Sequence, residues 1–132
     1  MILDTHVLIW LDCDDPTLGP AARAAVLAEW RAGRVAVSAI TFWEVAMLVD
    51  RARLQLPHTP AAWRARWLAA GLTEIPLDGR IAVAATQLND FHRDPADRFI
   101  LATANDLAQP LLTADRQLLA WRGPGERLDA TR

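Results

Sequence analysis

Short apolar runs and longer amphipathic segments alternate along the chain. Each short run ends at a polar or turn-forming residue, which is typical of a buried strand a few residues long. The segments between the runs repeat apolar residues at helical spacing, and several begin at Asp, Ser or Pro. We expect strands at residues 1–3, 35–38, 72–76 and 111–113, with a candidate fifth strand at 127–128.

Capping residues predict where the helices begin and end. Pro20 and Gly33 bracket an Ala-rich helix, and Ser38 is expected to cap a helix that runs to about residue 51. Asp94 should cap a helix that begins with Pro95. The expected helices are 6–11, 20–32, 39–51, 61–70, 78–88, 95–107 and 116–121. Strands that alternate with helices predict one α/β domain over residues 1–132, with a mainly parallel sheet of four to five short strands.

Length and composition describe an ordinary globular domain. The chain has 132 residues, which is enough to bury a core without staples. No apolar run approaches the ~20 residues that span a bilayer, so we expect no membrane partner and a cytoplasmic location. Cys13 is the only cysteine, which excludes an internal disulfide and a cysteine-rich metal site.

The charged residues restrict the partners and the catalytic mechanisms that the protein can have. A formal net charge of −2 argues against a protein that coats nucleic acid through bulk electrostatics. All 14 basic side chains are Arg and the chain has no Lys, which removes every mechanism that needs a catalytic lysine. The guanidinium group remains well suited to binding phosphate.

Carboxylates are placed at the ends of predicted elements. Asp4 follows the first strand, Asp115 follows the strand at 111–113, and Asp97 lies in the first turn of a helix. Glu44 lies within a helix, between Trp43 and Val45. A structural interpretation stays open for each of them, because Asp97 and Asp115 suit helix N-termini and Glu44 could be a surface residue.

In a parallel sheet, ligands bind beyond the carboxyl ends of the strands, where the strand order reverses. If the strands of Asp4 and Asp115 are neighbours, these acids meet there. Each close pair of carboxylates costs roughly 1 kcal/mol in water and about 4 kcal/mol at an effective dielectric of 20. A cation would relieve this repulsion, and a set of oxygen ligands selects Mg²⁺ or Mn²⁺. Two such ions could clamp a phosphodiester and activate a water molecule.

Four motifs in order resemble those of PIN-domain ribonucleases, and in particular the VapC-type toxins of toxin–antitoxin pairs. They are Leu3-Asp4-Thr5-His6-Val7-Leu8-Ile9-Trp10, Ser38 with Trp43-Glu44-Val45-Ala46, His92-Arg93-Asp94-Pro95 with Asp97-Arg98, and Leu112-Thr113-Ala114-Asp115. The resemblance implies a three-layer α/β/α sandwich and RNA cleavage that depends on Mg²⁺ or Mn²⁺. It also implies a homodimer or a toxin–antitoxin hetero-oligomer, with a VapB-like antitoxin as the partner.

The resemblance also assigns residues. The family's catalytic and metal-binding acids carry over onto Asp4, Glu44, Asp97 and Asp115. Its supporting hydroxyl groups carry over onto Thr5 and Thr113, and we expect Ser38 and Asp94 to support the site as caps. The candidate RNA-phosphate contacts are Arg51, Arg53, Arg93, Arg98 and Arg116. The chain departs from the family at three positions. Leu48 stands where relatives often have a basic residue, Ala52 where they often have Gly, and Ala96 where they commonly have an aromatic residue.

Other classes of protein explain the residues less well. A phosphoacceptor receiver domain needs a lysine, and a dehalogenase-type phosphatase needs an Asp where His6 stands. A metal-free ribonuclease could use two of His6, His58 and His92, although scattered histidines are more often surface or capping residues. A PIN-fold binding module with little or no nuclease activity stays open as the alternative function.

Overall fold

The computed structural model describes residues 1–91 and 94–132, and within them the strands form one parallel sheet. The strands are β1 (Ile2–Leu3), β2 (Ala36–Ser38), β3 (Thr73–Ile75), β4 (Leu111–Thr113) and β5 (Arg127–Asp129). Their spatial order is β3-β2-β1-β4-β5. β1 is central, and Ile2 is in register with Ala36 on one side and Leu111 on the other. The predicted pairing of the first strand with the strand at 111–113 is therefore confirmed.

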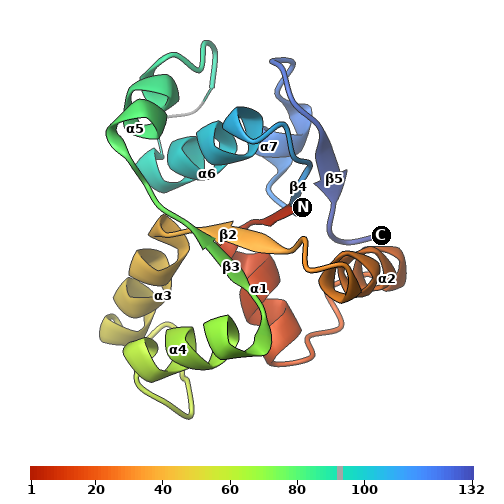
Figure 1. Cartoon of the computed structure of the whole chain (residues 1–132), viewed down its shortest axis with the longest axis vertical. Helices are drawn as coiled ribbons and strands as arrows, with labels where there is room; N and C mark the ends of the chain where they lie inside the picture. Colours follow the sequence, from red (N-terminus) through yellow and green to blue (C-terminus); the bar gives the residue numbers. More distant parts are fainter. Residues whose placement is uncertain (92–93) are drawn as a thin grey trace.

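The helices cover both faces of the sheet (Figure 1). They are α1 (Thr5–Asp12), α2 (Pro20–Arg31), α3 (Ile40–Asp50), α4 (Pro60–Ala70), α5 (Gly79–Thr86), α6 (Pro95–Asp106) and α7 (Arg116–Ala120). α2, α4 and α6 each begin with Pro, whose missing N–H costs nothing in the first turn. The predicted α/β class is confirmed, and no helix in the described part of the chain is long and apolar enough to cross a membrane.

Each face of the sheet has its own core, because side chains alternate along a strand. Leu3, Val37 and Leu112 point to the side of α1, α2, α3 and α4, where Trp63 and Val45 join them. On the other side, Ile2, Ala36 and Leu111 pack with residues of α6 and α7 such as Ile100 and Leu118. The sheet is thus buried on both faces, and its strand ends are the places where polar groups can gather.

The helix caps predicted at Asp94 and Ser38 had different outcomes, and Asp78, predicted as the first residue of a helix, is the cap of α5. The side chain of Asp78 accepts from the N–H of Ile81, and that of Asp94 accepts from the N–H groups of Ala96 and Asp97. Ser38, by contrast, is the last residue of β2, and the N-cap of α3 is Ala39. The chain turns from strand to helix one residue later than predicted, and the Ser38 hydroxyl instead accepts from the N–H of Ile40 at 3.3 Å.

Candidate active site

Asp4 lies at the carboxyl end of the central strand and is buried, with 2% of its surface exposed. Its Oδ1 accepts a hydrogen bond from the N–H of Thr5 at 2.8 Å, and its Oδ2 accepts one from the hydroxyl of Thr113 at 2.6 Å. Its own backbone N–H donates to the carbonyl of Leu112 at 3.0 Å. Asp4 is therefore both the N-cap of α1 and a carboxylate held against β4.

Asp4 and Asp115 are linked through one buried hydroxyl group. Thr113 Oγ1 donates to Asp4 and accepts from the N–H of Asp115 at 3.0 Å. Asp115 Oδ1 caps α7, because it accepts from the N–H groups of Gln117 and Leu118 at 2.8 and 3.0 Å. The predicted meeting of these two acids at one edge of the sheet is thus observed, and the capping role considered for Asp115 is also real.

Glu44 is a half-buried residue that faces the same edge, so its interpretation as a plain surface glutamate is wrong. Its Oε1 accepts from the hydroxyl of Thr5 at 2.5 Å, and the Thr5 hydroxyl also contacts that of Thr41 at 3.1 Å. Burial raises the pKa of Glu44 to about 7, the hydrogen bond from Thr5 opposes this, and the charges of Asp4 and Asp94 add to it. Glu44 is therefore close to half protonated at neutral pH.

Among these acids, Asp97 in the first turn of α6 has the most strongly raised pKa. Its pKa is raised to about 8, mainly by burial and then, in decreasing order, by the charges of Asp4, Asp94, Asp115 and Glu44. An α-helix N-terminus would by itself favour the charged form. Asp4 and Asp115, which follow β1 and β4, thus act electrostatically on the acids of α3 and α6.

The donor chemistry of this edge fits a hard divalent cation, but the side chains are not gathered around one point. Among residues 1–91 and 94–132, no three His, Cys, Asp or Glu side chains are arranged to hold an ion together. Both oxygens of Asp4 and one of Asp115 accept hydrogen bonds from their neighbours. A cation at this edge would therefore require side chains to rotate toward it. Its positive charge would oppose the burial and the repulsion between acids that together raise the pKa values of Asp97 and Glu44.

His6 belongs to this edge, although sequence reasoning placed it among surface or capping residues. Its Nε2 accepts a hydrogen bond from the N–H of Ala114 at 3.0 Å, and its Nδ1 lies 3.6 Å from Asp4 Oδ2. Its ring packs against Trp10 with centroids 4.8 Å apart. The sequence signal that could have identified His6 was its position. It lies two residues after the acid at the strand end, on a helix that begins directly after that acid.

The arginines predicted to contact RNA differ in how far they are engaged. Arg51, Arg53 and Arg116 are exposed. Arg98 instead donates to the carbonyl groups of Ala85, Leu88 and Phe91, at 3.0, 3.3 and 2.9 Å, and so fastens the segment after α5 to α6. Arg93 lies outside the described residues. Arg98 therefore has a structural task that its sequence position did not reveal.

The turn that carries Arg51 and Arg53 shows why relatives often have Gly in it. Ala52 has a φ of 55°, in the left-handed region that a Cβ atom disfavours. At Ala52 the departure from the family thus places a Cβ atom in a left-handed backbone conformation, at the expense of local strain.

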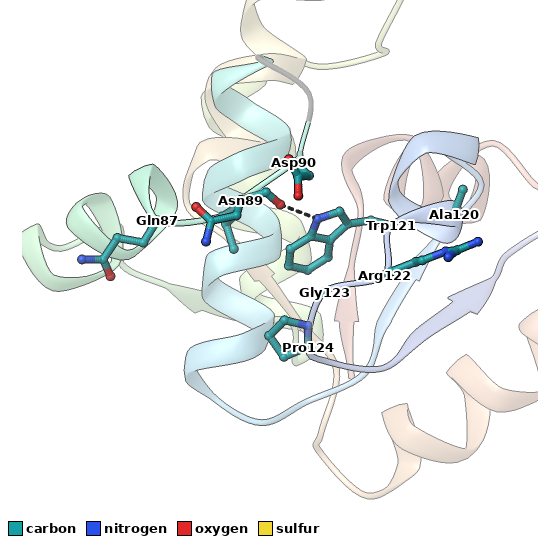
Figure 2. Close-up of a pocket in the computed structure, with 9 residues that line it drawn as sticks. Gln87, Asn89, Asp90, Ala120, Trp121, Arg122, Gly123 and Pro124 are labelled. Atoms are coloured by element: carbon teal, nitrogen blue, oxygen red, sulfur yellow. Dashed lines mark hydrogen bonds between the residues drawn. The ribbon is translucent and has the colours of Figure 1, made fainter.

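A separate hollow of about 700 Å³ lies between the segment after α5 and the turn after α7 (Figure 2). The indole N–H of Trp121 crosses between the two segments and donates to the carbonyl of Asn89 at 2.9 Å. Arg127 lies over the same ring, 5.2 Å from its centroid, and donates to the carbonyls of the turn. None of the four acids lines this hollow. The acids define the candidate active site, and the hollow is a feature of the neighbouring surface.

The fold and the acid-bearing strand ends define a class of protein, and comparison with known families agrees. Residues 1–122 match the family model described as the PIN domain. The chain belongs to the PIN-domain family. Within it, the chain is 34% identical over 125 residues to Ribonuclease VapC22 of Mycobacterium tuberculosis (strain ATCC 25618 / H37Rv), which covers 94% of this chain and 93% of that protein. The resemblance to VapC-type proteins seen in the sequence is confirmed.

Solved structures share the fold. A toxin–antitoxin complex from Klebsiella pneumoniae contains a chain with a TM-score of 0.66 and 22% identity, over 98% of this chain and 96% of that one. FitAcB from Neisseria gonorrhoeae gives a TM-score of 0.61 and 22% identity, over 98% of this chain and 96% of that one. At these identities the likeness shows that the α/β architecture is a PIN-like sandwich.

Proposed function

We propose that this protein is a divalent-cation-dependent endoribonuclease and the toxin of a toxin–antitoxin pair. The observation that carries the proposal is the group of mutually repelling acids at the carboxyl edge, with the pKa of Asp97 raised to about 8 and that of Glu44 to about 7. Such shifts gather at sites whose function needs uncompensated negative charge. Membership of the PIN family and the likeness to Ribonuclease VapC22 support the same activity.

Asp4, Glu44, Asp97 and Asp115 are the proposed ligands of Mg²⁺ or Mn²⁺. Bound there, the cation would supply a Lewis acid for the phosphodiester and a water molecule of lowered pKa. The ligands are hard oxygens, as these two ions require. The ordinary alternative, acids that only cap helices, does not account for Glu44, which caps nothing and is half-buried against Thr5.

The remaining residues would orient this site. Thr113 fixes Asp4 Oδ2 and the backbone of Asp115, and Thr5 fixes Glu44 Oε1. Asp94 holds the first turn of α6 in place through the N–H groups of Ala96 and Asp97. Ser38 supports the β2 end of the edge through Ile40. Each protein group thus aims a carboxylate and leaves the chemical step to the acids and the cation.

RNA would approach over the exposed arginines at the ends of α3 and α7. Arg51, Arg53 and Arg116 are proposed to bind its phosphates, together with Arg93. Arg98 is left out of this set, because its guanidinium already donates to three carbonyl groups.

A metal-free mechanism with two histidines fits the geometry poorly. The Nε2 atom of His6 already accepts a hydrogen bond from the backbone N–H of Ala114. An imidazole nitrogen in that position is not available to take a proton from a ribose hydroxyl.

The proposed partners are RNA as the substrate, a VapB-like antitoxin as the inhibitor, and a second copy of the chain. The similar structures from Klebsiella pneumoniae and Neisseria gonorrhoeae include a toxin–antitoxin complex, which supports an antitoxin. Trp43 on α3 is 56% exposed and offers an apolar contact for a homodimer, whereas Trp63 is buried in the core. Such a pair would act in the cytoplasm.

The test is cleavage of a fluorescent single-stranded RNA by protein stripped of metal with a chelator. Adding Mn²⁺ or Mg²⁺ should start cleavage, and Asp97→Asn should lower it by about 100-fold or more. Asp106→Asn is the matched control, because Asp106 lies at the other end of α6 and pairs with Arg80. No cleavage under any metal condition would favour the PIN-fold binding module instead, and full cleavage by Asp97→Asn would remove Asp97 from the proposed ligands.

A further inference from the structure

We infer that His6 is a positioning residue, which ties the acid at the end of β1 to the turn that follows β4. The inference rests on the proposed function, because it concerns how Asp4 and Asp115 are held for that activity. The carrying observation is the hydrogen bond from the N–H of Ala114 to His6 Nε2 at 3.0 Å, which joins the two chain segments in addition to the bond between Thr113 and Asp4.

This bond determines the protonation of the ring. A nitrogen that accepts from a backbone N–H carries no proton, so the neutral imidazole of His6 must carry its proton on Nδ1. Nδ1 is the atom that faces Asp4 Oδ2, at 3.6 Å. The ring therefore presents an acceptor to β4 and a positive edge to the carboxylate of β1, an orientation that the opposite tautomer could not provide.

The bond also completes the geometry of the β4 turn. Two successive backbone N–H groups leave the end of β4, from Ala114 and Asp115. The first donates to His6, and the second donates to the hydroxyl of Thr113, which itself holds Asp4. His6 of α1 thus holds the first of these peptide groups directly, and Thr113, which itself contacts Asp4, holds the second.

The ring is itself held in place. Trp10, one helical turn further along α1, packs on it with centroids 4.8 Å apart and a tilt of 58°. The His6 side chain is 33% exposed, so it is neither a core residue nor a free surface group. A capping histidine would bind the end of its own helix, whereas His6 binds a residue 108 positions away.

Three variants separate positioning from simple packing. His6→Ala removes the acceptor, and His6→Gln can return one, because the glutamine amide oxygen lies near the place of Nε2. His58→Ala is the control, since His58 lies in the connection between α3 and α4, away from the acids. Thermal unfolding and circular dichroism of each variant establish that it is folded.

The expected result is a loss in turnover that the glutamine variant repairs. His6→Ala should lower the kcat for RNA cleavage, and the affinity for Mn²⁺ measured by calorimetry, by about 10- to 100-fold, as for other residues that orient ligands. The KM for RNA should stay nearly constant, and His6→Gln should recover most of both losses. Equal losses in the Ala and Gln variants, or an unchanged kcat in both, would overturn the inference.

A measurement on the metal-free wild-type protein needs neither activity nor a variant. Long-range proton–nitrogen NMR correlations at pH 8 should show a protonated Nδ1 and an unprotonated Nε2 in His6. The opposite tautomer would overturn the inference even if RNA cleavage is normal. The expected tautomer in a protein that fails to cleave RNA would leave the positioning geometry intact and refute the nuclease proposal instead.

Discussion

At the amino ends of the strands the charged groups are paired, whereas at the carboxyl ends they are acids that repel one another. The ammonium group of Met1 donates to the carbonyl of Arg34 at 2.8 Å and to Gln109 Oε1 at 3.0 Å, and it lies 4.0 Å from Glu29. Glu29 in turn accepts two hydrogen bonds from Arg34, at 3.0 and 2.9 Å, which lower its pKa. At the other end, burial and, after it, the neighbouring acids raise the pKa of Asp97 to about 8.

The difference indicates which end carries function. Both ends place ionisable groups beside short strands of the same sheet, so a position near a strand end does not by itself produce the repulsion. Where stability was the only requirement, the charges are balanced by arginine and backbone carbonyls. An edge that keeps four acids together and leaves two of them with raised pKa values stores unfavourable energy, which a bound cation can release.

The largest expected effect is on RNA cleavage, when Glu is replaced by Gln once at the carboxyl ends and once at the amino ends of the strands. Glu44→Gln should lower RNA cleavage by about 100-fold, because it removes one proposed oxygen ligand and its negative charge. Glu29→Gln should leave cleavage unchanged and lower the melting temperature slightly, because it weakens only the contacts to Arg34 and Met1. Initial cleavage rates at saturating Mg²⁺ measure the effect of each variant on activity. Equal rates for the two variants would show that the two ends of the strands do not differ in function.

A smaller effect is expected from the buried hydroxyl groups. Thr113→Val removes the donor to Asp4 Oδ2 and the acceptor of the Asp115 N–H, so the free energy of unfolding should fall by about 1–3 kcal/mol. Thr103→Val is the control, because the equally buried Thr103 hydroxyl donates only to the carbonyl of Phe99 within α6. Urea unfolding of both variants would contradict the account if Thr103→Val proved the more costly change.

The smallest effect is the dependence of stability on pH in metal-free protein. Asp97 and Glu44 have folded-state pKa values of about 8 and about 7, above their ordinary values, so the folded state binds more protons between about pH 4 and pH 8. Their contribution to stability is therefore lost as the pH rises through that range. The melting temperature should fall from pH 6 to pH 8.5, less steeply in Asp97→Asn, and Mg²⁺ at pH 8.5 should restore it. A variant with the wild-type slope would show that Asp97 does not titrate as described.

The sequence predicted the architecture because its signals are local. A short segment is enough to specify each element, without reference to the rest of the chain. Examples are the apolar runs Ile2–Leu3 and Leu111–Thr113 and the Pro at the start of α6. The site followed from placing acids at strand ends, a rule that the order of the strands then satisfied.

What the sequence could not supply were contacts between distant segments. The bond between His6 and Ala114 joins residues 108 positions apart, and the three carbonyl groups bound by Arg98 belong to the segment before it. In both cases the residue type suits several roles, and only the packing of α1 on β4 or of α6 on α5 selects one. The prediction for Ser38 was wrong for the opposite reason. Ser is a good cap residue, but here it is the last residue of a strand.

The central claim is that the carboxyl edge holds a divalent cation by giving up protons. Isothermal titration of Mn²⁺ into metal-free protein at pH 7, repeated in two buffers of different ionisation enthalpy, measures binding and proton release together. We predict that Mn²⁺ binds and that protons are released, because Asp97 and Glu44 must ionise. The proton release should be smaller in Asp97→Asn. Binding without proton release, or binding that is unchanged in Asp97→Asn, would contradict this claim.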